Sequence, residues 1–347
     1  MLIVRSPVRI SFGGGGTDLA AYYERFGGMV VSASINKYIY GIVSRNFDTT
    51  FQVISADYRT MLHVPIDGPA QANAGVELKL CHVIYEHFNV PLPLNVFIAS
   101  EVPPGTGLGS SSTLSVTLCN IFSTLTGNTM GRTQLAETAY MIETQRMEAP
   151  IGKQDQYAAA FGGLNCFEFS TDGVRVTPLE MTTATIRGLE RRLMLFYTGA
   201  TRQAREILHE QRAESERSSG RTIEALHQIK ALGWKIKAAL ENGQLDDFGA
   251  LLDESWQHKK RLASGISTPL IDEAYTQARQ SGAGGGKITG AGGGGFLMLY
   301  CPEDRQSDVR GALEKLGLQQ MRCAFEFEGS RVLLHTNLLN PAYNWNQ

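Results

Sequence analysis

The chain has 347 residues, of which 43% are hydrophobic and 19% are charged, and this composition is typical of folded globular proteins rather than disordered ones. The formal net charge of -2 gives no general attraction to nucleic acid or to an anionic membrane, so a basic site must be local. No apolar run approaches the roughly 20 residues that span a bilayer, and the N-terminal segment lacks the features of a signal peptide. We therefore expect a cytoplasmic protein without nucleic-acid or membrane partners.

The length fits two domains of common size. The five cysteines are widely spaced and lie mostly in apolar runs, and they form neither a CxxC pair nor a cluster with zinc-ligand spacing. The sequence therefore predicts buried free thiols and no structural metal.

Residues 1 to about 180 mix strand-like and helical segments, which predicts an α/β first half. The strand-like runs are at 38–45, 51–56 and 94–103, and the helical stretches are at about 75–89, 111–126 and 133–147. The chain then turns helical between about 201 and 262. Beyond it we predict two strands around a glycine turn at 283–302, a helix at 304–317 and a strand at 321–329. This order favours an α+β protein whose second domain contains an antiparallel sheet.

The 37 glycines concentrate in three clusters. The most informative is EVPPGTGLGSSST at 101–113, which follows a predicted strand and enters a predicted helix at its serines. A helix N-terminus offers unpaired N–H groups and a partial positive charge, and small residues let this backbone come close to an anion. Such an arrangement suits a di- or triphosphate. The alternative is a glycine-rich turn with a serine N-cap.

The third cluster, GAGGGKITGAGGGG at 282–295, contains two misleading patterns. Lys287 is followed by isoleucine, so the segment is not a Walker A loop. Gly290, Gly292 and Gly295 match G-x-G-x-x-G, but a predicted strand follows them where a dinucleotide fold requires a helix. The remaining interpretations are a loop that closes near a phosphate or against the second cluster, and a purely structural hairpin.

The first cluster, RSPVRISFGGGGTDLAAYY at 5–23, puts Arg9 on a strand and four glycines in a loop, with Thr17 and Asp18 at a helix start. Four glycines allow close approach of the backbone to a ligand. Asp18 is interpreted either as an N-cap or as an acceptor of hydrogen bonds from sugar hydroxyls.

In this order, the three clusters resemble the signature motifs of the GHMP kinases, which are named for galactokinase, homoserine kinase, mevalonate kinase and phosphomevalonate kinase. The matching segments are PPGTGLGSSS, ITGAGGGG and RISFGGGGTDL. The resemblance implies a ribosomal-protein-like α/β domain at 1–188, with its phosphate loop at 103–112. It also implies a ferredoxin-like domain at 189–347, with a glycine loop at 287–295, and an active site in the cleft between the two domains.

Within the family, RISFGGGGTD, IETQR and GKQDQYAAAFGG are most similar to the D-glycero-D-manno-heptose 7-phosphate kinases, followed by the fucokinases. The resemblance implies ATP-dependent phosphorylation of the sugar phosphate at C1, giving heptose 1,7-bisphosphate for nucleotide-activated heptose and bacterial surface polysaccharide. The alternatives are a kinase of an unphosphorylated sugar and a catalytically silent sugar sensor. The sequence leaves open whether the chain forms a homo-oligomer.

Two residues carry the catalytic prediction. Asp155 matches the aspartate of the family's GxxDQ segment, which implies a base for the C1 hydroxyl; without the family, an N-cap is the simpler interpretation. Arg9 aligns with the basic residue of the first motif, which implies a charge near the transferred phosphoryl group. An ion pair between Arg9 and Asp155 is compatible with both roles.

The resemblance also implies ligands for the cofactors ATP and Mg²⁺. Glu143 and Ser111 would share the Mg²⁺ ion, a hard cation that prefers oxygen ligands. The alternatives are an ion pair between Glu143 and Arg146, and Glu148 in place of Glu143. The predicted nucleotide ligands are Pro104, Gly105, Gly107, Leu108, Gly109, Ser110, Ser111, Ser112 and Gly292.

The sugar is expected to contact the first cluster, and its phosphate is expected to need cations. The predicted sugar ligands are Gly14, Gly15, Thr17 and Asp18. For the distal phosphate we predict Lys153 and Arg202, with Arg205 one helical turn beyond; a solvated helix face explains the two arginines equally well.

Overall fold

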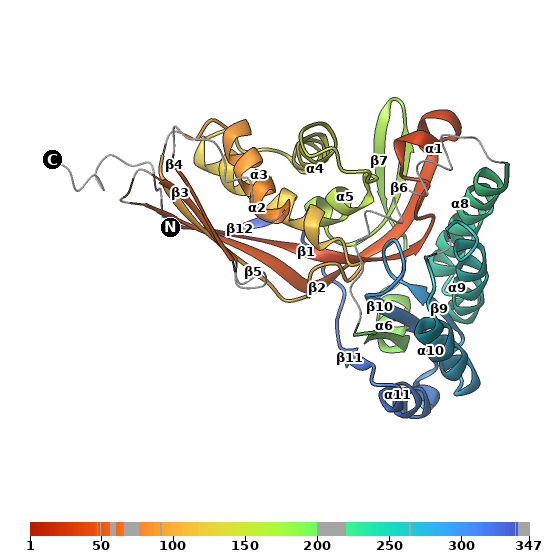
Figure 1. The fold of residues 1–347 in the computed structure, drawn as a ribbon. Coiled ribbons are helices and arrows are strands. Elements are labelled where there is room, and N and C mark those ends of the chain that lie inside the picture. The colour runs from red at the N-terminus through yellow and green to blue at the C-terminus, as the bar shows by residue number, and fades with distance from the viewer. Residues whose placement is uncertain are drawn as a thin grey trace.

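A computed structural model gives the fold in Figure 1. It describes residues 1–46, 48, 50–55, 60–65, 76–90, 92–199, 220–263, 265–336 and 338. None of the described helices combines the length and apolar content that crossing a membrane would require.

The described part of the N-terminal half is built on an eight-stranded sheet with the order β12-β1-β2-β5-β3-β4, to which β6 and β7 are added beside β2. All neighbours are antiparallel except β3 and β5. The strands are β1 (Leu2–Gly13), β2 (Gly28–Arg45), β3 (Thr50–Ser55), β4 (Thr60–Pro65), β5 (Leu94–Ser100), β6 (Leu164–Ser170), β7 (Gly173–Pro178) and β12 (Arg331–His335). The 18-residue β2 is long enough to pair with β6 along its first part and with β5 along its last part.

Helices cover one face of this sheet (Figure 1). They are α2 (Val76–His87), α3 (Ser110–Leu125), α4 (Arg132–Met141), the π-helical turn η1 (Ile142–Arg146) and α5 (Gln154–Phe161). The central helix, α3, is buried on nearly all sides, and its hydroxyls bond back to its own backbone. Thr113 Oγ1 donates to the Gly109 carbonyl at 2.9 Å, and Thr117 Oγ1 donates to the Thr113 carbonyl at 2.8 Å. These bonds satisfy the hydroxyls of Thr113 and Thr117 inside the protein, so a helix rich in serine and threonine can be buried.

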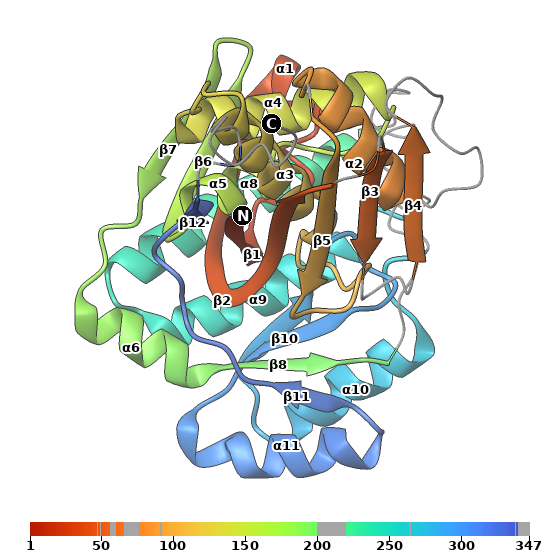
Figure 2. The same ribbon diagram turned by 90° about the vertical axis from the view of Figure 1, so that its left-hand side faces the viewer.

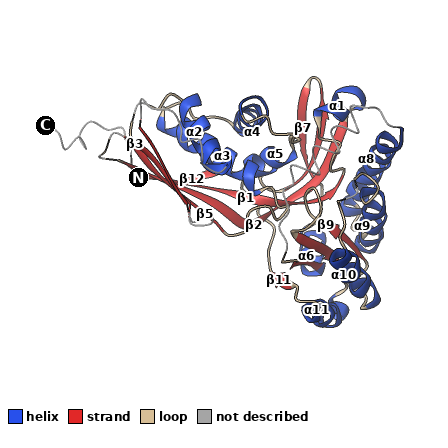
Figure 3. Ribbon diagram, in the orientation of Figure 1, coloured by secondary structure: helices blue, strands red, loops and turns tan. Residues whose placement is uncertain are grey.

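The second part contains an antiparallel sheet with the order β11-β8-β10-β9 (Figure 2). Its strands are β8 (Leu193–Tyr197), β9 (Gly285–Ile288), β10 (Phe296–Tyr300) and β11 (Gln319–Met321). The remaining helices are α1 (Ala20–Phe26), α6 (Thr183–Arg192), α8 (Gly220–Glu241), α9 (Leu245–Lys259), α10 (Pro269–Gln280), the 3₁₀ turn η2 (Glu303–Arg305) and α11 (Gln306–Lys315). Figure 3 separates the helices from the two sheets by colour. The α+β prediction is confirmed.

One hydrophobic core runs from the first sheet into the second part. Phe12 of β1 meets Phe248 of α9 edge to face, with ring centroids 5.3 Å apart, and Phe248 meets Tyr300 of β10 at 5.9 Å. Such aromatic pairs pack like a domain interior. The two parts are therefore held together at the glycine-rich ends of their strands, where the candidate site lies.

The C-terminal segment differs from the predicted order. The strand predicted at 321–329 is wrong, because β11 ends at Met321 and Phe325 makes only an isolated bridge to Ile35 of β2. The chain leaves the second sheet at this point and returns to the first, where β12 pairs with β1. Residues 331–335 thus belong to the N-terminal sheet, although the predicted division at 188/189 assigns them to the second domain.

Four of the five cysteines, Cys81, Cys119, Cys166 and Cys301, are buried and Cys323 is partly buried, and none of the five forms a disulfide.

Candidate functional site

The phosphate loop, residues 103–112, connects β5 to α3. Gly105, Gly107 and Gly109 have φ angles of 71°, 76° and 77°, a region that side chains disfavour. Gly109 is the N-cap of α3, and no side chain caps that helix end. The first N–H groups of α3, from Ser110 onward, are therefore available to an anion. The predicted entry into a helix at the serines is confirmed.

The third glycine cluster closes against this loop, as one of its two interpretations predicts. Thr289 Oγ1 donates to the Thr106 carbonyl at 3.1 Å, and Phe296 N donates to the same oxygen at 3.3 Å. A Cβ on Gly107 would overlap the Thr289 carbonyl, and one on Gly290 would overlap the Gly107 backbone. The two loops touch at backbone distance because neither glycine carries a side chain.

Gly292 lies elsewhere in the third cluster. A Cβ built on it would be 2.9 Å from the backbone of Ile266. The residues of the cluster that meet the phosphate loop include Thr289, Gly290 and Gly295. The nucleotide contact of Gly292 stays a prediction.

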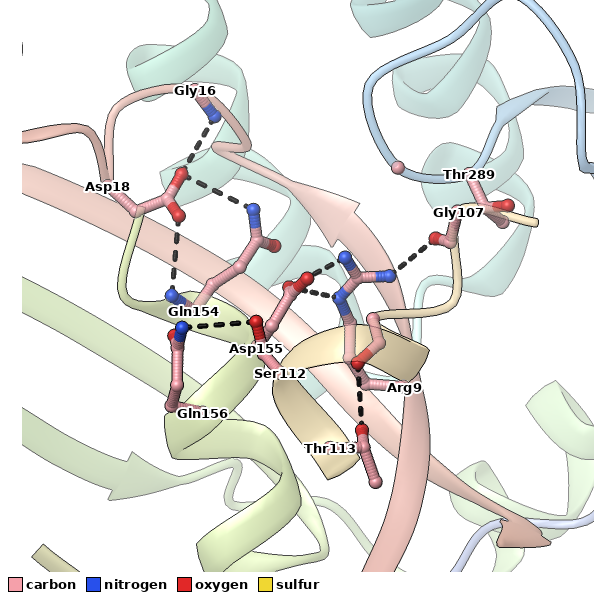
Figure 4. Close-up of polar contacts among 12 residues, drawn as sticks. Arg9, Gly16, Asp18, Gly107, Ser112, Thr113, Gln154, Asp155, Gln156 and Thr289 are labelled. Carbon is pink, nitrogen blue, oxygen red and sulfur yellow. Dashed lines mark hydrogen bonds and ion pairs between the residues drawn. The ribbon is translucent and has the colours of Figure 1, made fainter. Parts of the chain in front are cut away.

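Buried Arg9 and partly exposed Asp155 form an ion pair below the phosphate loop (Figure 4). Asp155, in the first turn of α5, accepts through Oδ1 from Nη2 and Nε of Arg9, at 2.6 and 2.8 Å. Arg9 also donates through Nη1 to the Gly107 carbonyl at 2.6 Å, and its N–H donates to the Leu108 carbonyl at 3.0 Å. Arg9 thereby fixes the carboxylate and the phosphate loop to the same strand.

The second oxygen of Asp155, Oδ2, has no hydrogen-bond partner among the described residues. It faces Gly109, on which a Cβ would lie 3.1 Å from this oxygen. The unpaired oxygen therefore points toward the N-terminus of α3.

Asp18 lies across the site from Asp155 (Figure 4). Its carboxylate accepts from the Gly16 N–H at 2.9 Å and from the backbone N–H and side-chain amide of Gln154, both at 3.3 Å. Burial raises the pKa of Asp18, and the charge of Asp155 raises it further. Asp18 thus bonds to the start of α5 and is not the N-cap of α1, which is Leu19.

Within the first cluster, the Thr17 side chain stabilises the backbone of the protein itself. Its hydroxyl bonds to the Gly14 carbonyl and to the backbone of Met29, at 2.8 to 3.0 Å, and the residue is fully buried. Its predicted contact with a sugar hydroxyl has no room in this geometry. Gly14 is likewise packed against Met29, because a Cβ there would overlap the Met29 carbonyl.

Gly15 faces polar atoms instead. A Cβ on Gly15 would lie 3.6 Å from Ser11 Oγ and 3.8 Å from Gln154 Nε2. Ser11 Oγ and Gln154 Oε1 are buried, and neither has a hydrogen-bond partner in the described part of the chain. A bound hydroxylated molecule would supply the partners that these two oxygens lack.

Glu143 is 4% exposed and lies in η1. Its carboxylate accepts from Ser112 Oγ at 3.1 Å and from Gln156 Nε2 at 2.8 Å, whereas the Ser111 side chain is exposed. Burial raises the pKa of Glu143 to about 7, although the hydrogen bonds from Gln156 and Ser112 oppose this effect. The serine beside Glu143 is therefore Ser112 and not the predicted Ser111.

The structure favours Glu143 over its alternatives. Arg146 pairs with Glu86 at 3.0 Å, and Glu148 is exposed.

The predicted cations for a distal phosphate receive little support. Lys153 donates to both carboxylate oxygens of Glu137, at 2.8 and 2.9 Å, so its charge is already compensated. Arg202 and Arg205 lie outside the described residues.

Comparisons with known proteins identify the family. The model described as "GHMP kinases N terminal domain" matches residues 77–163, and the one described as "GHMP kinases C terminal" matches residues 236–318. A D-glycero-alpha-D-manno-heptose 7-phosphate kinase of Campylobacter jejuni is 31% identical over 318 residues, which cover 90% of this chain and 92% of the relative. The chain belongs to the GHMP kinases.

Two further relatives agree with this GHMP kinase assignment. The crystal structure of a D-glycero-D-manno-heptose 1-phosphate kinase from Bacteroides thetaiotaomicron superposes with a TM-score of 0.79 at 27% identity, covering 96% of this chain and 99% of the other. An L-fucokinase/L-fucose-1-P guanylyltransferase of Bacteroides fragilis is 28% identical over 88% of this chain, which spans only 35% of that longer protein.

The residues of this GHMP kinase fit the phosphates of a nucleotide. The uncapped start of α3 and the side-chain-free surface of the phosphate loop form a cradle that Cβ atoms would fill. The residues of the site also fit a metal ion that is held mainly by the nucleotide. Glu143 is the buried carboxylate beside α3, and the described ranges contain no cluster of three His, Cys, Asp or Glu side chains that could hold a metal by themselves.

Sequence reasoning missed several polar residues at this site. Ser11, Gln154 and Gln156 stand within the quoted motifs, but their sequence carries no signal for a role. Each has one buried side-chain oxygen without a hydrogen-bond partner among the described residues, which only the three-dimensional structure reveals. Lys287 was considered only as a Walker lysine. Lys259 stands in no motif, because its approach to the glycine loops depends on the packing of α9.

Proposed function

We propose that this GHMP kinase transfers the γ-phosphoryl group of ATP to the C1 hydroxyl of D-glycero-D-manno-heptose 7-phosphate, giving heptose 1,7-bisphosphate. The observation that carries the catalytic part is the Asp155 carboxylate, which has one oxygen held by Arg9 and the other unpaired toward the start of α3. The heptose is supported by the two heptose kinases among the relatives.

In this proposal Asp155 Oδ2 accepts the proton of the C1 hydroxyl as that oxygen bonds to phosphorus. The bond between the γ-phosphorus and the bridging oxygen breaks, and ADP leaves with the electron pair. Arg9 keeps Asp155 in position and offsets the negative charge that develops on the transferred group. The N–H groups at the start of α3 bind the phosphates of the nucleotide.

Glu143 and Ser112 are the proposed protein ligands of Mg²⁺, with Ser111 as the neighbouring hydroxyl that the sequence prediction named. The ion, when bound, supplies positive charge to the phosphates. A bound cation would favour the ionised form of Glu143, opposing the effect of its burial.

The proposed sugar ligands are Asp18, Gly15, Ser11 and Gln154. A carboxylate and two oxygens without partners suit a molecule rich in hydroxyl groups. Arg202 remains a proposed ligand of the distal phosphate.

A second candidate function is a fucokinase-like reaction on an unphosphorylated sugar. It is favoured by one observation: Lys153, a predicted phosphate ligand, is already paired with Glu137. The fucokinase among the relatives supports the same alternative.

The test is an ADP-release assay with ATP and Mg²⁺ on six sugars: D-glycero-D-manno-heptose 7-phosphate, sedoheptulose 7-phosphate, mannose 6-phosphate, mannose, fucose and galactose. We expect the highest kcat/KM with the manno-heptose 7-phosphate, and ³¹P NMR of the product should show a phosphate on the anomeric carbon. Preference for fucose would select the second candidate. Nucleotide binding without turnover on any sugar would contradict both and favour a sensor.

A further inference from the structure

Two lysines of the C-terminal half anchor the glycine loops, and the proposed reaction uses neither. Lys287 lies on β9 and is 4% exposed, and its Nζ donates to the Phe12 carbonyl at 3.2 Å. Lys259 is the last residue of α9, and its Nζ donates to the Ile288 carbonyl at 3.3 Å and to the Gly290 carbonyl. Each lysine therefore holds backbone next to a loop of the site.

These lysines and Arg9 form a group of three basic side chains with a single carboxylate. Neither lysine takes part in any ion pair found between described residues, and Asp155 is already paired with Arg9. Burial, then the charges of Lys287 and Arg9, lower the pKa of Lys259 well below its usual value. Burial, then Arg9, lower that of Lys287 to about 7. A buried positive charge without a counterion is costly, so without a ligand the protonated form of both lysines is disfavoured. An anion bound beside them would offset this cost.

The position of the cluster indicates what kind of anion it faces. Lys259 bonds to Gly290, whose backbone touches Gly107, and Gly107 in turn accepts from Arg9. Lys287 bonds to Phe12, immediately before the Gly13–Gly16 loop. The cluster thus joins the phosphate loop to the loop on the proposed sugar side.

We propose that Lys259 and Lys287 form, together with Arg9, a receptor for a phosphate group carried by a substrate. This inference rests on the proposed function, because that reaction brings two such groups into the site. One is the γ-phosphate of the nucleotide, and the other is the phosphate already on the sugar. In both cases the bound dianion favours the protonated form of each lysine and compensates its charge.

Glutamine variants separate charge from anchoring. In Lys259→Gln and Lys287→Gln the amide keeps a hydrogen-bond donor for the carbonyls of Phe12, Ile288 and Gly290 but removes the positive charge. The matched control is Lys260→Gln: Lys260 follows Lys259 directly, lies over the Trp256 ring and is 3.9 Å from an Asp272 oxygen. Far-UV circular dichroism and thermal unfolding check that each variant is folded.

Two pairs of ligands identify the source of the phosphate. Calorimetry measures binding of a non-hydrolysable ATP analogue against ADP, and of heptose 7-phosphate against the free heptose. A γ-phosphate receptor predicts at least a tenfold loss of affinity for the ATP analogue in both glutamine variants, with ADP changed less than twofold. A receptor for the sugar phosphate predicts the same loss for heptose 7-phosphate alone.

Arginine variants provide the complementary test. Lys259→Arg and Lys287→Arg keep the charge, so they should retain most of the affinity that the glutamine variants lose. Folded glutamine variants that bind both phosphorylated ligands within twofold of wild type would overturn the receptor. If the glutamine variants do not fold, the arginine variants are compared with Lys259→Ala and Lys287→Ala. Folded arginine variants that lose as much affinity as the alanine variants would also overturn the proposed phosphate receptor.

The outcomes also distinguish this inference from the proposed function. Wild-type protein that binds the ATP analogue through the lysines but phosphorylates no heptose refutes the reaction and leaves the receptor standing. Turnover of heptose 7-phosphate, together with glutamine variants that bind like wild type, supports the reaction and refutes the receptor.

Discussion

Asp155 has two carboxylate oxygens with different surroundings. Oδ1 accepts two hydrogen bonds from Arg9, whereas Oδ2 accepts none from the described residues. The guanidinium therefore determines which oxygen is presented to a substrate. Because both partners come from rigid elements, β1 and α5, the orientation does not depend on a loop.

We expect Asp155→Asn to lower kcat by about 10² to 10⁴, because the amide cannot accept the hydroxyl proton. Affinity for a nucleotide analogue should change only a few-fold, since Arg9 can still bond to the Gly107 carbonyl. ADP release and calorimetry measure the two quantities. Asp172→Asn, an exposed aspartate in the β6–β7 turn, is the control. A kcat within tenfold of wild type would remove Asp155 as the base.

Lys287 predicts a pH-dependent stability without ligand. Its pKa is about 7 in the folded protein, against 10.5 for an ordinary lysine. Between these two pH values Lys287 is protonated in the unfolded chain and neutral in the folded chain, so its contribution to the free energy of unfolding rises with pH. The destabilisation caused by burying Lys287 is therefore largest at pH 7 and below. Lys287→Gln should therefore raise the free energy of unfolding at pH 7 and have little effect near pH 10.

Urea unfolding at pH 7, 8.5 and 10 measures this difference, with Lys260→Gln as the control. The basic groups near Lys287 are Arg9 and Lys259, and burial, Lys287 and Arg9 also lower the pKa of Lys259. Lys259→Gln should therefore be measured at the same three pH values. A gain that is equal at all three pH values would show that the charge of Lys287 is not its cause.

At the scale of elements, the site is made where two glycine loops touch. Gly107 and Gly127 provide a matched pair, because their φ angles are 76° and 77°. A Cβ on Gly127 has no neighbour within 4 Å, whereas one on Gly107 would overlap the Thr289 carbonyl. Alanine at position 127 therefore reports backbone strain alone.

We expect Gly127→Ala to cost about 1 kcal/mol of stability. Gly107→Ala should cost more and should also weaken nucleotide binding at least tenfold, because the two loops must separate. Urea unfolding and calorimetry with an ATP analogue give both values. Equal effects of the two substitutions would mean that the loop contact has no importance for binding.

The loops were predictable from sequence because their signals are local. A strand, glycines with positive φ and a helix beginning at serine follow one another in the chain, so the phosphate loop and the start of α3 are found without tertiary information. The choice between Ser111 and Ser112 was not predictable in this way. Adjacent residues differ by about 100° around a helix, and only the packing of α3 decides which hydroxyl meets Glu143.

Contacts between distant segments escaped prediction for the same reason. Lys259 reaches the glycine loops only because α9 packs on β9. Thr17 has the sequence context of a sugar ligand, but its hydroxyl bonds to Met29, which lies on β2. The run at 321–329 has the composition of a strand, but the chain uses it to cross between sheets. Composition gives a preference for extended backbone and does not specify its partner.

For the whole molecule, the continuous core predicts one cooperative unfolding transition. Phe12, Phe248 and Tyr300 connect the first sheet to the second, so unfolding of one part exposes apolar surface of the other. Tryptophan fluorescence of a variant that keeps only Trp256, which is buried in the second part, and far-UV circular dichroism of the whole chain should change at the same urea concentration. Two separated transitions would indicate independent domains.

The pairing of β12 with β1 has a consequence for protein synthesis. Of the strands that the structure describes, β1 emerges first from the ribosome and β12 emerges last, yet they are neighbours in the sheet. One edge of β1 therefore stays unpaired during nearly all of translation, and unpaired edges tend to associate with other chains. The closing pair is also among the least local contacts in the molecule, which makes the final folding step slow. A stalled ribosome would leave a chain whose sheet is open at this edge.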